Sequence, residues 1–218
     1  MPGDSQTEPD VTKTGNSDRK TRTRTRIFDA VVRCLDEVGY SETSINRVQT
    51  LAGVSRGALT HHFPSKEAMM VQTVERLLAP VRGPSGPGDD AGLIHPAGAE
   101  RDVAAELTRL WAEVINTRQG RALMEILVAS RTDDALRARI TPALQEYNDA
   151  FNHNIAHLYD AISGDTGDLA LLWSICRSFM RGLHSQAPYE RDPEVMTRMV
   201  ARFAEIMAPH MRAKQEPS

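Results

Sequence analysis

The chain has 218 residues, of which 40% are hydrophobic and 25% charged, the usual balance of a globular protein with one or two buried cores. No apolar run approaches the roughly 18 residues that a membrane-spanning helix needs, and the polar first 26 residues lead us to expect no secretory signal. Cys34 and Cys176 both fall within apolar helical patterns, which favours buried thiols and a cytoplasmic protein.

The net charge of −3 is unevenly distributed along the chain. Residues 19–66 hold nine Lys or Arg against four Asp or Glu, a net +5, which leaves −8 for the remainder. A basic segment attached to an acidic body favours a polyanionic partner for that end of the chain. The charge of this segment alone is equally consistent with a charged surface that faces only solvent.

The N-terminal part of the chain predicts a tail followed by a first helix. Residues 1–18 are rich in Pro, Gly, Ser, Thr and Asp and are predicted to be disordered. From residue 21 to 38 the apolar residues recur at helical spacing, and Gly39 supplies a stop. The apolar positions of this helix are Ile27, Ala30, Val31, Cys34, Leu35 and Val38.

Three N-cap serines then predict three further helices. Ser44 begins a short helix that directs Ile45, Val48 and Leu51 inward. Ser55 begins another, which ends near His62 and buries Ala58 and Leu59. Ser65 begins a fourth helix that runs to about Arg82.

The rest of the chain is also predicted to be helical. Residues 83–98 are loaded with Gly and Pro and predict a loop. Helical patterns follow over 100–118 (ending at Gly120), 121–130, 133–163, 168–186 capped by Asp168, and 192–208. Thr141-Pro142 indicates either a kink or a new helix start. We find no strand pattern, so the predicted fold class is all-α with about nine helices.

The turn between the second and third helices points to a function. A three-residue Ala52-Gly53-Val54 turn needs a glycine with positive φ and an apolar residue at the helix corner. The third helix is too short and polar for a core, and its outer positions are Arg56, Gly57, Thr60 and His61. Such a helix fits a major groove about 12 Å wide. Arginines 19, 22, 24 and 26 place donors against phosphates or a minor groove.

Residues 24–78 resemble the DNA-binding module of the TetR (tetracycline-repressor-like) family. The matching positions are Gly39-Tyr40, Thr43-Ser44-Ile45, Ala52-Gly53-Val54-Ser55-Arg56-Gly57-Ala58-Leu59, His62-Phe63 and Ser65-Lys66-Glu67. The resemblance implies a helix-turn-helix DNA-binding domain at 19–66 and a helical effector-binding and dimerisation domain at 67–218. It further implies a homodimer, in which helices 168–186 and 192–208 form a four-helix bundle with their copies.

The implied function is a sequence-specific transcriptional regulator, a repressor that a small-molecule effector releases from a palindromic double-stranded DNA operator. We expect the coupling to pass through residues 65–82 alone. A ligand-independent regulator and an activator stay open as alternatives.

Individual roles are carried over by position. Arg56, Gly57 and Thr60 would lie nearest the bases, with Asn46 at the groove edge, although Arg56 as a phosphate contact is as plausible as Arg56 as a base contact. The phosphate contacts carried over are Ser44, Ser55, His61 and Lys66. Arg22 and Arg24, from the alternation before the first helix, are expected to contact phosphates or the minor groove. The chain departs from the family pattern at Thr60 (usually tyrosine), Gln49 (usually alanine) and Arg47 (often acidic, closing a capping box with Ser44).

Candidates for an effector pocket are large side chains of the later helices, which would serve equally well as plain core: Trp111, Met124, Phe151, Trp173 and Phe179. His153 and His157 have the i, i+4 spacing of metal ligands, with His184 as a further candidate. This leaves a helical metal-binding protein or enzyme as a minor alternative. No catalytic motif occurs, so we expect no enzyme, no cofactor and no metal.

Overall fold

The computed structural model describes residues 11–82, 102–192 and 194–214. The described residues form nine α-helices, as the sequence predicts, with short π, 3₁₀ and strand segments between them. The elements are α1 (Val11–Glu42), α2 (Ile45–Ala52), α3 (Arg56–His62), α4 (Lys66–Arg82), α5 (Val103–Leu110), a π-helical turn (Trp111–Ile115), α6 (Arg118–Ser130), α7 (Asp134–Leu158), β1 (Tyr159–Ala161), α8 (Thr166–Gln186), a 3₁₀ turn (Ala187–Tyr189), α9 (Glu194–Met207), a second 3₁₀ turn (Ala208–His210) and β2 (Met211–Ala213).

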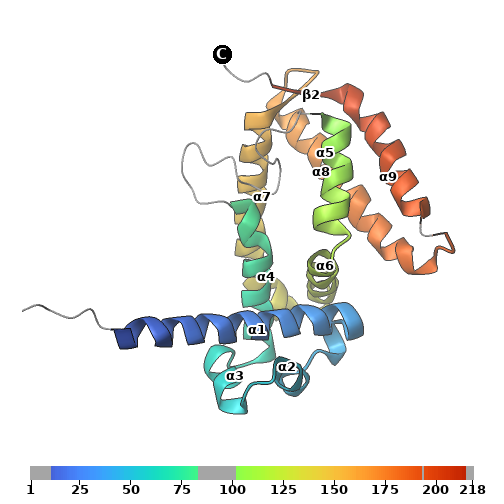
Figure 1. The fold of residues 1–218 in the computed structure, drawn as a ribbon. Coiled ribbons are helices and arrows are strands. Elements are labelled where there is room, and N and C mark those ends of the chain that lie inside the picture. The colour runs from blue at the N-terminus through green and yellow to red at the C-terminus, as the bar shows by residue number, and fades with distance from the viewer. Residues whose placement is uncertain (1–10, 83–101, 193, 215–218) are drawn as a thin grey trace, which may run out of the picture.

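Helices α1, α2 and α3 form a small module at one end of the molecule (Figure 1). Its core consists of the apolar stripe of α1 together with Val48 of α2 and Leu59 of α3, both fully buried. The stripe of α1 includes Ile27, Ala30, Val31, Cys34 and Leu35, as predicted. Leu51 and Val38, which were expected inside, are 38% and 36% exposed. In α2 the buried positions are Val48 and Ala52, four residues apart, so Leu51 lies off the buried stripe.

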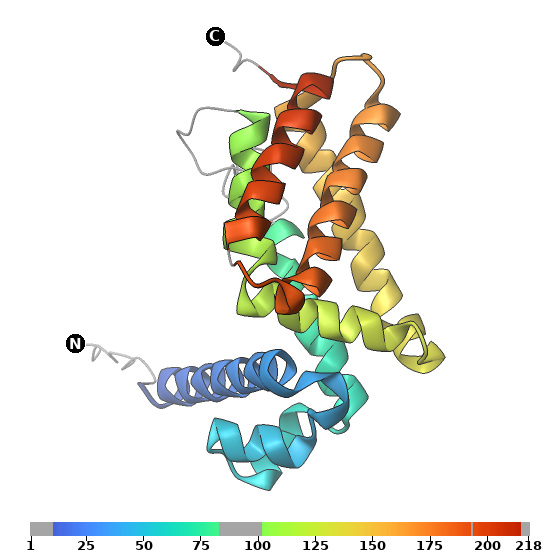
Figure 2. The same cartoon turned by 90° about the vertical axis from the view of Figure 1, so that its right-hand side faces the viewer.

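Helix α4 leads from this module into a larger body formed by α5 to α9 (Figure 1). Helix α4 packs along α7, α5 packs against α9, and α6 lies across α1. Figure 2 shows α8 and α9 side by side on one face of the body. Trp173 of α8 and Leu136 of α7 are fully buried in its core. Among the described helices, none is long and apolar enough to cross a lipid bilayer.

The start of α1 differs from the prediction. The helix begins at Val11, so residues 11–18, which were assigned to a disordered tail, have helical backbone. A helix that is already nucleated by a buried stretch extends at little cost per residue, even through poor helix formers. At its other end Gly39 breaks the helix with φ 76° and ψ 174°, as expected. Residues 1–10 and the predicted loop at 83–98 lie outside the described residues.

Three boundaries in the body also differ. Helix α7 runs unbroken past Pro142, so this proline does not start a new helix. The N-cap of α8 lies three residues earlier than predicted, because the Oδ1 of Asp165, not of Asp168, accepts the capping hydrogen bond from the N–H of Gly167. Strands β1 and β2 pair antiparallel, with Asp160 opposite Arg212, and were missed because three residues are too few to show alternation.

Gly120 does not end a helix but lies inside the first turn of α6. The helix predicted over 100–118 ends earlier, and the hydroxyl of Thr117 caps α6 by accepting from the Gly120 N–H at 3.1 Å. A Cβ atom on Gly120 would lie 2.1 Å from the carbonyl oxygen of Ile115 and 2.6 Å from that of Val114. The close approach of these two backbone segments therefore requires glycine.

We expect Gly120→Ala to lower the free energy of unfolding by about 1–3 kcal/mol, because the backbone of the π-helical turn must move away. Gly182→Ala in α8 is the matched control, since no atom lies within 4 Å of its added Cβ. This control should stabilise the protein by about 0.5–1 kcal/mol, the usual gain in a helix interior. Urea unfolding at a fixed protein concentration measures both, and equal effects at the two positions would contradict the assignment.

Candidate nucleic-acid interface

A tight turn fixes the angle between α2 and α3. Gly53 has φ 60° and ψ 41°, and its N–H donates to the carbonyl of Thr50 at 3.2 Å. The hydroxyl of Ser55 then accepts the N–H of Ala58 at 3.2 Å and begins α3. Ala52 and Leu59 are buried on either side of the turn. The predicted helix-turn-helix geometry is thus present.

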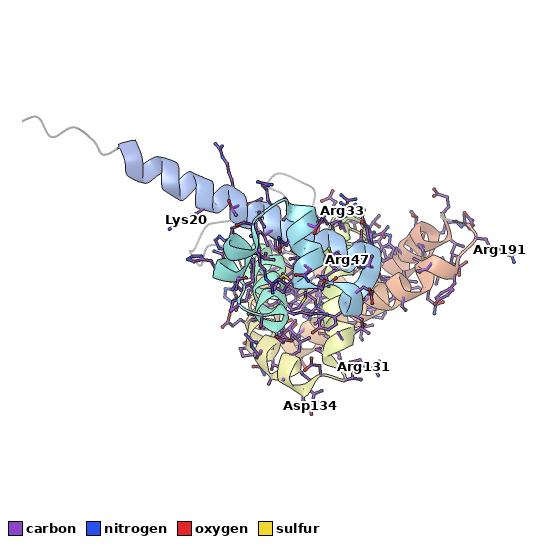
Figure 3. The ribbon with its side chains drawn as sticks, turned by 90° about the horizontal axis from the view of Figure 1, so that it is seen from below. Lys20, Arg33, Arg47, Arg131, Asp134 and Arg191 are labelled. Atoms are coloured by element: carbon purple, nitrogen blue, oxygen red, sulfur yellow. The ribbon has the colours of Figure 1, made fainter. Side chains whose placement is uncertain are left out.

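Helix α3 presents a polar, solvent-exposed face. Arg56, Gly57, Thr60 and His61 are all exposed, while Leu59 anchors the opposite side. A Cβ on Gly57 would meet no atom within 4 Å, so the helix surface is open there. The Thr60 hydroxyl donates to the carbonyl of Arg56 at 2.9 Å and keeps its lone pairs for a further donor. Figure 3 looks onto this end of the molecule, with Lys20, Arg33 and Arg47 labelled.

The flanking candidates are also exposed. Arg22 and Arg24 lie on α1, and Asn46 lies in the first turn of α2. The hydroxyl of Ser44 accepts the N–H of Arg47 at 3.2 Å and caps α2. Of the ten residues predicted to meet DNA, nine are therefore exposed, and the exception is Lys66.

Lys66 is occupied within the protein. Its Nζ donates to the carbonyl of Tyr40 at 2.7 Å and to that of Ser41 at 3.2 Å. The ammonium also lies 4.3 Å from the centroid of the Tyr40 ring. Burial lowers the pKa of Lys66, against the opposing charges of Glu67 and Glu42. Lys66 thus holds the chain after Gly39 in place, and we do not include it in the proposed interface.

Arg26, like Lys66, donates to backbone carbonyls of the module, a role that the sequence did not indicate. Its Nη2 donates to the carbonyls of Ala52 at 2.7 Å and Gly53 at 3.1 Å. A guanidinium at this position satisfies the C-terminal end of α2 and favours its dipole. Arg26 therefore positions the turn, in contrast to the phosphate role expected from its alternation with Arg22 and Arg24.

The departures from the family pattern are accommodated. Arg47 turns to Glu42, with Nη2 and Oε2 3.4 Å apart, in place of the reciprocal bond of a capping box. Gln49 is half-buried between the helices, and its backbone carbonyl accepts the N–H of Val54 at 3.4 Å.

His62 packs beside Phe63, with ring centroids 6.3 Å apart. Burial lowers the pKa of His62, and the positive charges of neighbouring residues lower it further.

An ion-pair cluster joins the module to the body. Asp36 of α1 pairs with Arg118 at 3.2 Å and with Arg121, both from α6, and its side chain is 10% exposed. Burial raises the pKa of Asp36, but the hydrogen bonds from the two arginines outweigh it and hold the pKa below its ordinary value. The N–H of Tyr40 also donates to Oε2 of Glu125 at 3.2 Å. Residues 65–82 are therefore not the only element that joins the module to the body, as the coupling expectation assumed, because α6 forms a second contact.

The five effector-pocket candidates come from four elements of the body: the π-helical turn, α6, α7 and α8. Phe151 and Trp173 meet edge to face in the body core, with centroids 6.2 Å apart. Trp111 is buried in the π-helical turn, and Met124 is half-buried on α6. Phe179 instead stacks on Phe203 of α9 with centroids 3.9 Å apart.

The histidine pair on α7 lies on the surface. The Nε2 atoms of His153 and His157 are 2.9 Å apart, a hydrogen-bond distance, and both residues are exposed. Within the described ranges, no group of three or more His, Cys, Asp or Glu could hold a metal ion.

Lys66→Met should lower the free energy of unfolding by about 1–2 kcal/mol, because two backbone carbonyls lose their charged donor. Arg22→Met, at an exposed position of α1, should leave stability unchanged. It should instead weaken duplex binding and reduce the salt slope by about one. Thermal unfolding and salt-dependent DNA titrations separate the structural role of Lys66 from the DNA-binding role of Arg22. A loss of stability in Arg22→Met would contradict the role assigned to Arg22.

Comparisons with known proteins agree with this geometry. Residues 27–73 match the family model described as bacterial regulatory proteins, tetR family. The HTH-type transcriptional regulator CymR of Pseudomonas putida is 28% identical over 193 residues, which cover 87% of this chain and 91% of that protein.

Solved structures share the fold over most of the chain. A TetR-family member from Streptomyces coelicolor A3 has a TM-score of 0.56 at 21% identity, covering 86% of this chain and 98% of that one. The multidrug binding protein EbrR, solved with ethidium, has a TM-score of 0.54 at 20% identity, covering 86% and 99%.

The helix-turn-helix match over residues 27–73, the similarity that extends along almost the whole chain and the shared all-helical fold together make this protein similar to transcriptional regulators of the TetR family.

Proposed function

We propose that the protein is a cytoplasmic homodimeric repressor that binds a near-palindromic operator and leaves it when a small molecule binds the body. The observation that carries the proposal is the short exposed α3, held by a buried anchor at Leu59 and a capped turn at Gly53. Residues 19–66 form the DNA-binding part in this proposal, and residues 67–218 bind the effector and the second subunit.

The proposed contacts follow from exposure. Arg56, Gly57 and Thr60 lie on the surface of α3 and reach base edges in the major groove, with Asn46 beside them. Backbone phosphates are bound by Arg22, Arg24, Ser44, Ser55 and His61. Two such helices in a dimer read half-sites about 34–36 Å apart.

Exposed apolar side chains on α8 and α9 support dimerisation through these helices. Leu171 and Ile175 of α8 are 58% and 43% exposed, and Met199 and Ile206 of α9 are 41% and 56% exposed. Phe179 and Phe203 stack between the two helices. Helices α8 and α9 lie side by side (Figure 2). In this proposal the exposed residues of the two helices form one apolar surface, which a second copy covers.

Release from DNA would follow from linked equilibria. An effector that prefers one arrangement of the body helices changes DNA affinity only if that arrangement alters the spacing of the two α3 helices. Two contacts carry such a change: α4 against α7, and α6 against α1 through Asp36.

A selection from random duplexes should enrich a near-palindromic site. On that site Arg56→Ala should cost about 1–3 kcal/mol and relax discrimination at one base pair if Arg56 reads a base. If Arg56→Ala lowers the affinity for all operator variants equally, Arg56 contacts a phosphate and not a base. Failure of the purified protein to enrich any duplex at moderate salt would refute DNA binding itself.

Phe203→Glu should produce monomers with much weaker operator binding, because the charge would be buried between subunits. Val128→Glu is the control, since Val128 is 55% exposed on α6 and lies outside the α8–α9 surface. Sedimentation and operator titration measure both variants. A dimeric Phe203→Glu protein of unchanged affinity would refute this dimer surface.

A further inference from the structure

The side of α8 that faces α7 changes from apolar to cationic along the helix. Leu169 and Trp173 are buried, and Arg177 and Arg181 follow at four-residue intervals on the same stripe. Arg177 is only 9% exposed, and Arg181 is half-buried. Two guanidinium groups therefore lie within the packed body.

Among the described residues, the side chains that contact the Arg177 guanidinium are neutral. Its Nη1 donates to Oδ1 of Asn148 at 3.1 Å, and its Nη2 to the hydroxyl of Ser174 at 3.3 Å. The guanidinium carbon lies 4.2 Å from the centroid of the Phe151 ring and 5.8 Å from that of Tyr147. Within the described part of the chain, the buried Nε of Arg177 has no hydrogen-bond partner.

Arg181 adds a second charge without neutralising the first. Burial lowers the pKa of Arg181; the nearby Tyr147 opposes the shift, and the positive charge of Arg177 adds to it. No Asp or Glu among residues 11–82, 102–192 and 194–214 is in an ion pair with either arginine. A guanidinium stays protonated at physiological pH, so burial cannot neutralise it. Such a charge is costly unless an anion accompanies it.

A second donor lacks a partner nearby. The indole Nε1 of Trp173 is buried with no acceptor among the described residues, and its ring meets the same Phe151 that Arg177 covers. Phe151 thus lies beside a guanidinium and an indole that both have a free N–H. A planar guanidinium suits a carboxylate or phosphate group, and the aromatic rings suit an apolar body.

From this arrangement we infer that the effector is a small organic anion. Its carboxylate or phosphate group is bound by Arg177 and Arg181 between α7 and α8, and its apolar part lies against Phe151 and Trp173. The inference rests on the proposed effector-regulated function, and it specifies the chemical class of the effector.

The first test compares acids with neutral analogues of the same shape. Benzoate and octanoate are paired with benzamide and octanamide, and phenyl phosphate tests the phosphate alternative. Thermal unfolding and calorimetry are run on the full chain without DNA. At least one acid at a hundredfold excess over its Kd should raise the Tm by about 5 °C, with no shift from its amide. If no acid binds better than its neutral counterpart, the inference is refuted.

The second test uses Arg177→Met, with Arg131→Met at the exposed turn between α6 and α7 as the control (Figure 3). Arg177→Met should weaken anion binding about tenfold or more and should raise the Tm of the unliganded protein, because an uncompensated buried charge is removed. Arg131→Met should change neither quantity. A lower Tm with unchanged anion binding would assign Arg177 to structure alone and overturn the inference.

The operator selection is read separately from these measurements. A protein that binds the acid but enriches no duplex would refute the proposed regulator and leave the anion site standing. A protein that binds its operator but no acid would refute only the anion site.

Discussion

The contact between α1 and α6 is the constraint on which the placement of the DNA-reading surface depends. Asp36 is almost enclosed, and two guanidinium groups from α6 satisfy its oxygens. Separating the helices would leave a carboxylate without these charge-assisted partners, so α1 and α6 are expected to move together. Since α3 packs on α2, α2 packs on α1 and α4 leaves the same module toward α7, the orientation of the recognition helix is set by two contacts with the body.

Much of the fold could be read from the sequence because its signals are local. Ser44, Ser55 and Ser65 cap helices at the positions where an N-cap hydroxyl meets the backbone three residues later. Gly39 and Gly53 mark two of the three positive-φ positions among the described residues. The exposed face of α3 follows from the spacing of its polar residues around a single buried leucine. These features need no knowledge of distant parts of the chain.

The features that the sequence did not predict depend on contacts between residues far apart in the chain. Lys66 and Arg26 are of the residue types that commonly bind phosphate. Each instead donates to backbone carbonyls about 26 residues away, a contact that no spacing rule predicts. Arg121 lies 85 residues from Asp36. Gly120 resembles a helix stop, and only the carbonyl of Ile115 beside it shows that it permits a close backbone approach. Arg177 looks like one of many surface arginines until its burial is known.

Gly57 has a consequence for engineering new DNA specificities. Its position on α3 has open space around it, so the glycine is not required by packing within the protein. A side chain introduced there would extend outward from the fold, and its main effect would fall on whatever lies against the helix. Residue 57 is therefore a natural position for a library that retargets the protein to orthogonal promoters, with little risk of losing expression through misfolding.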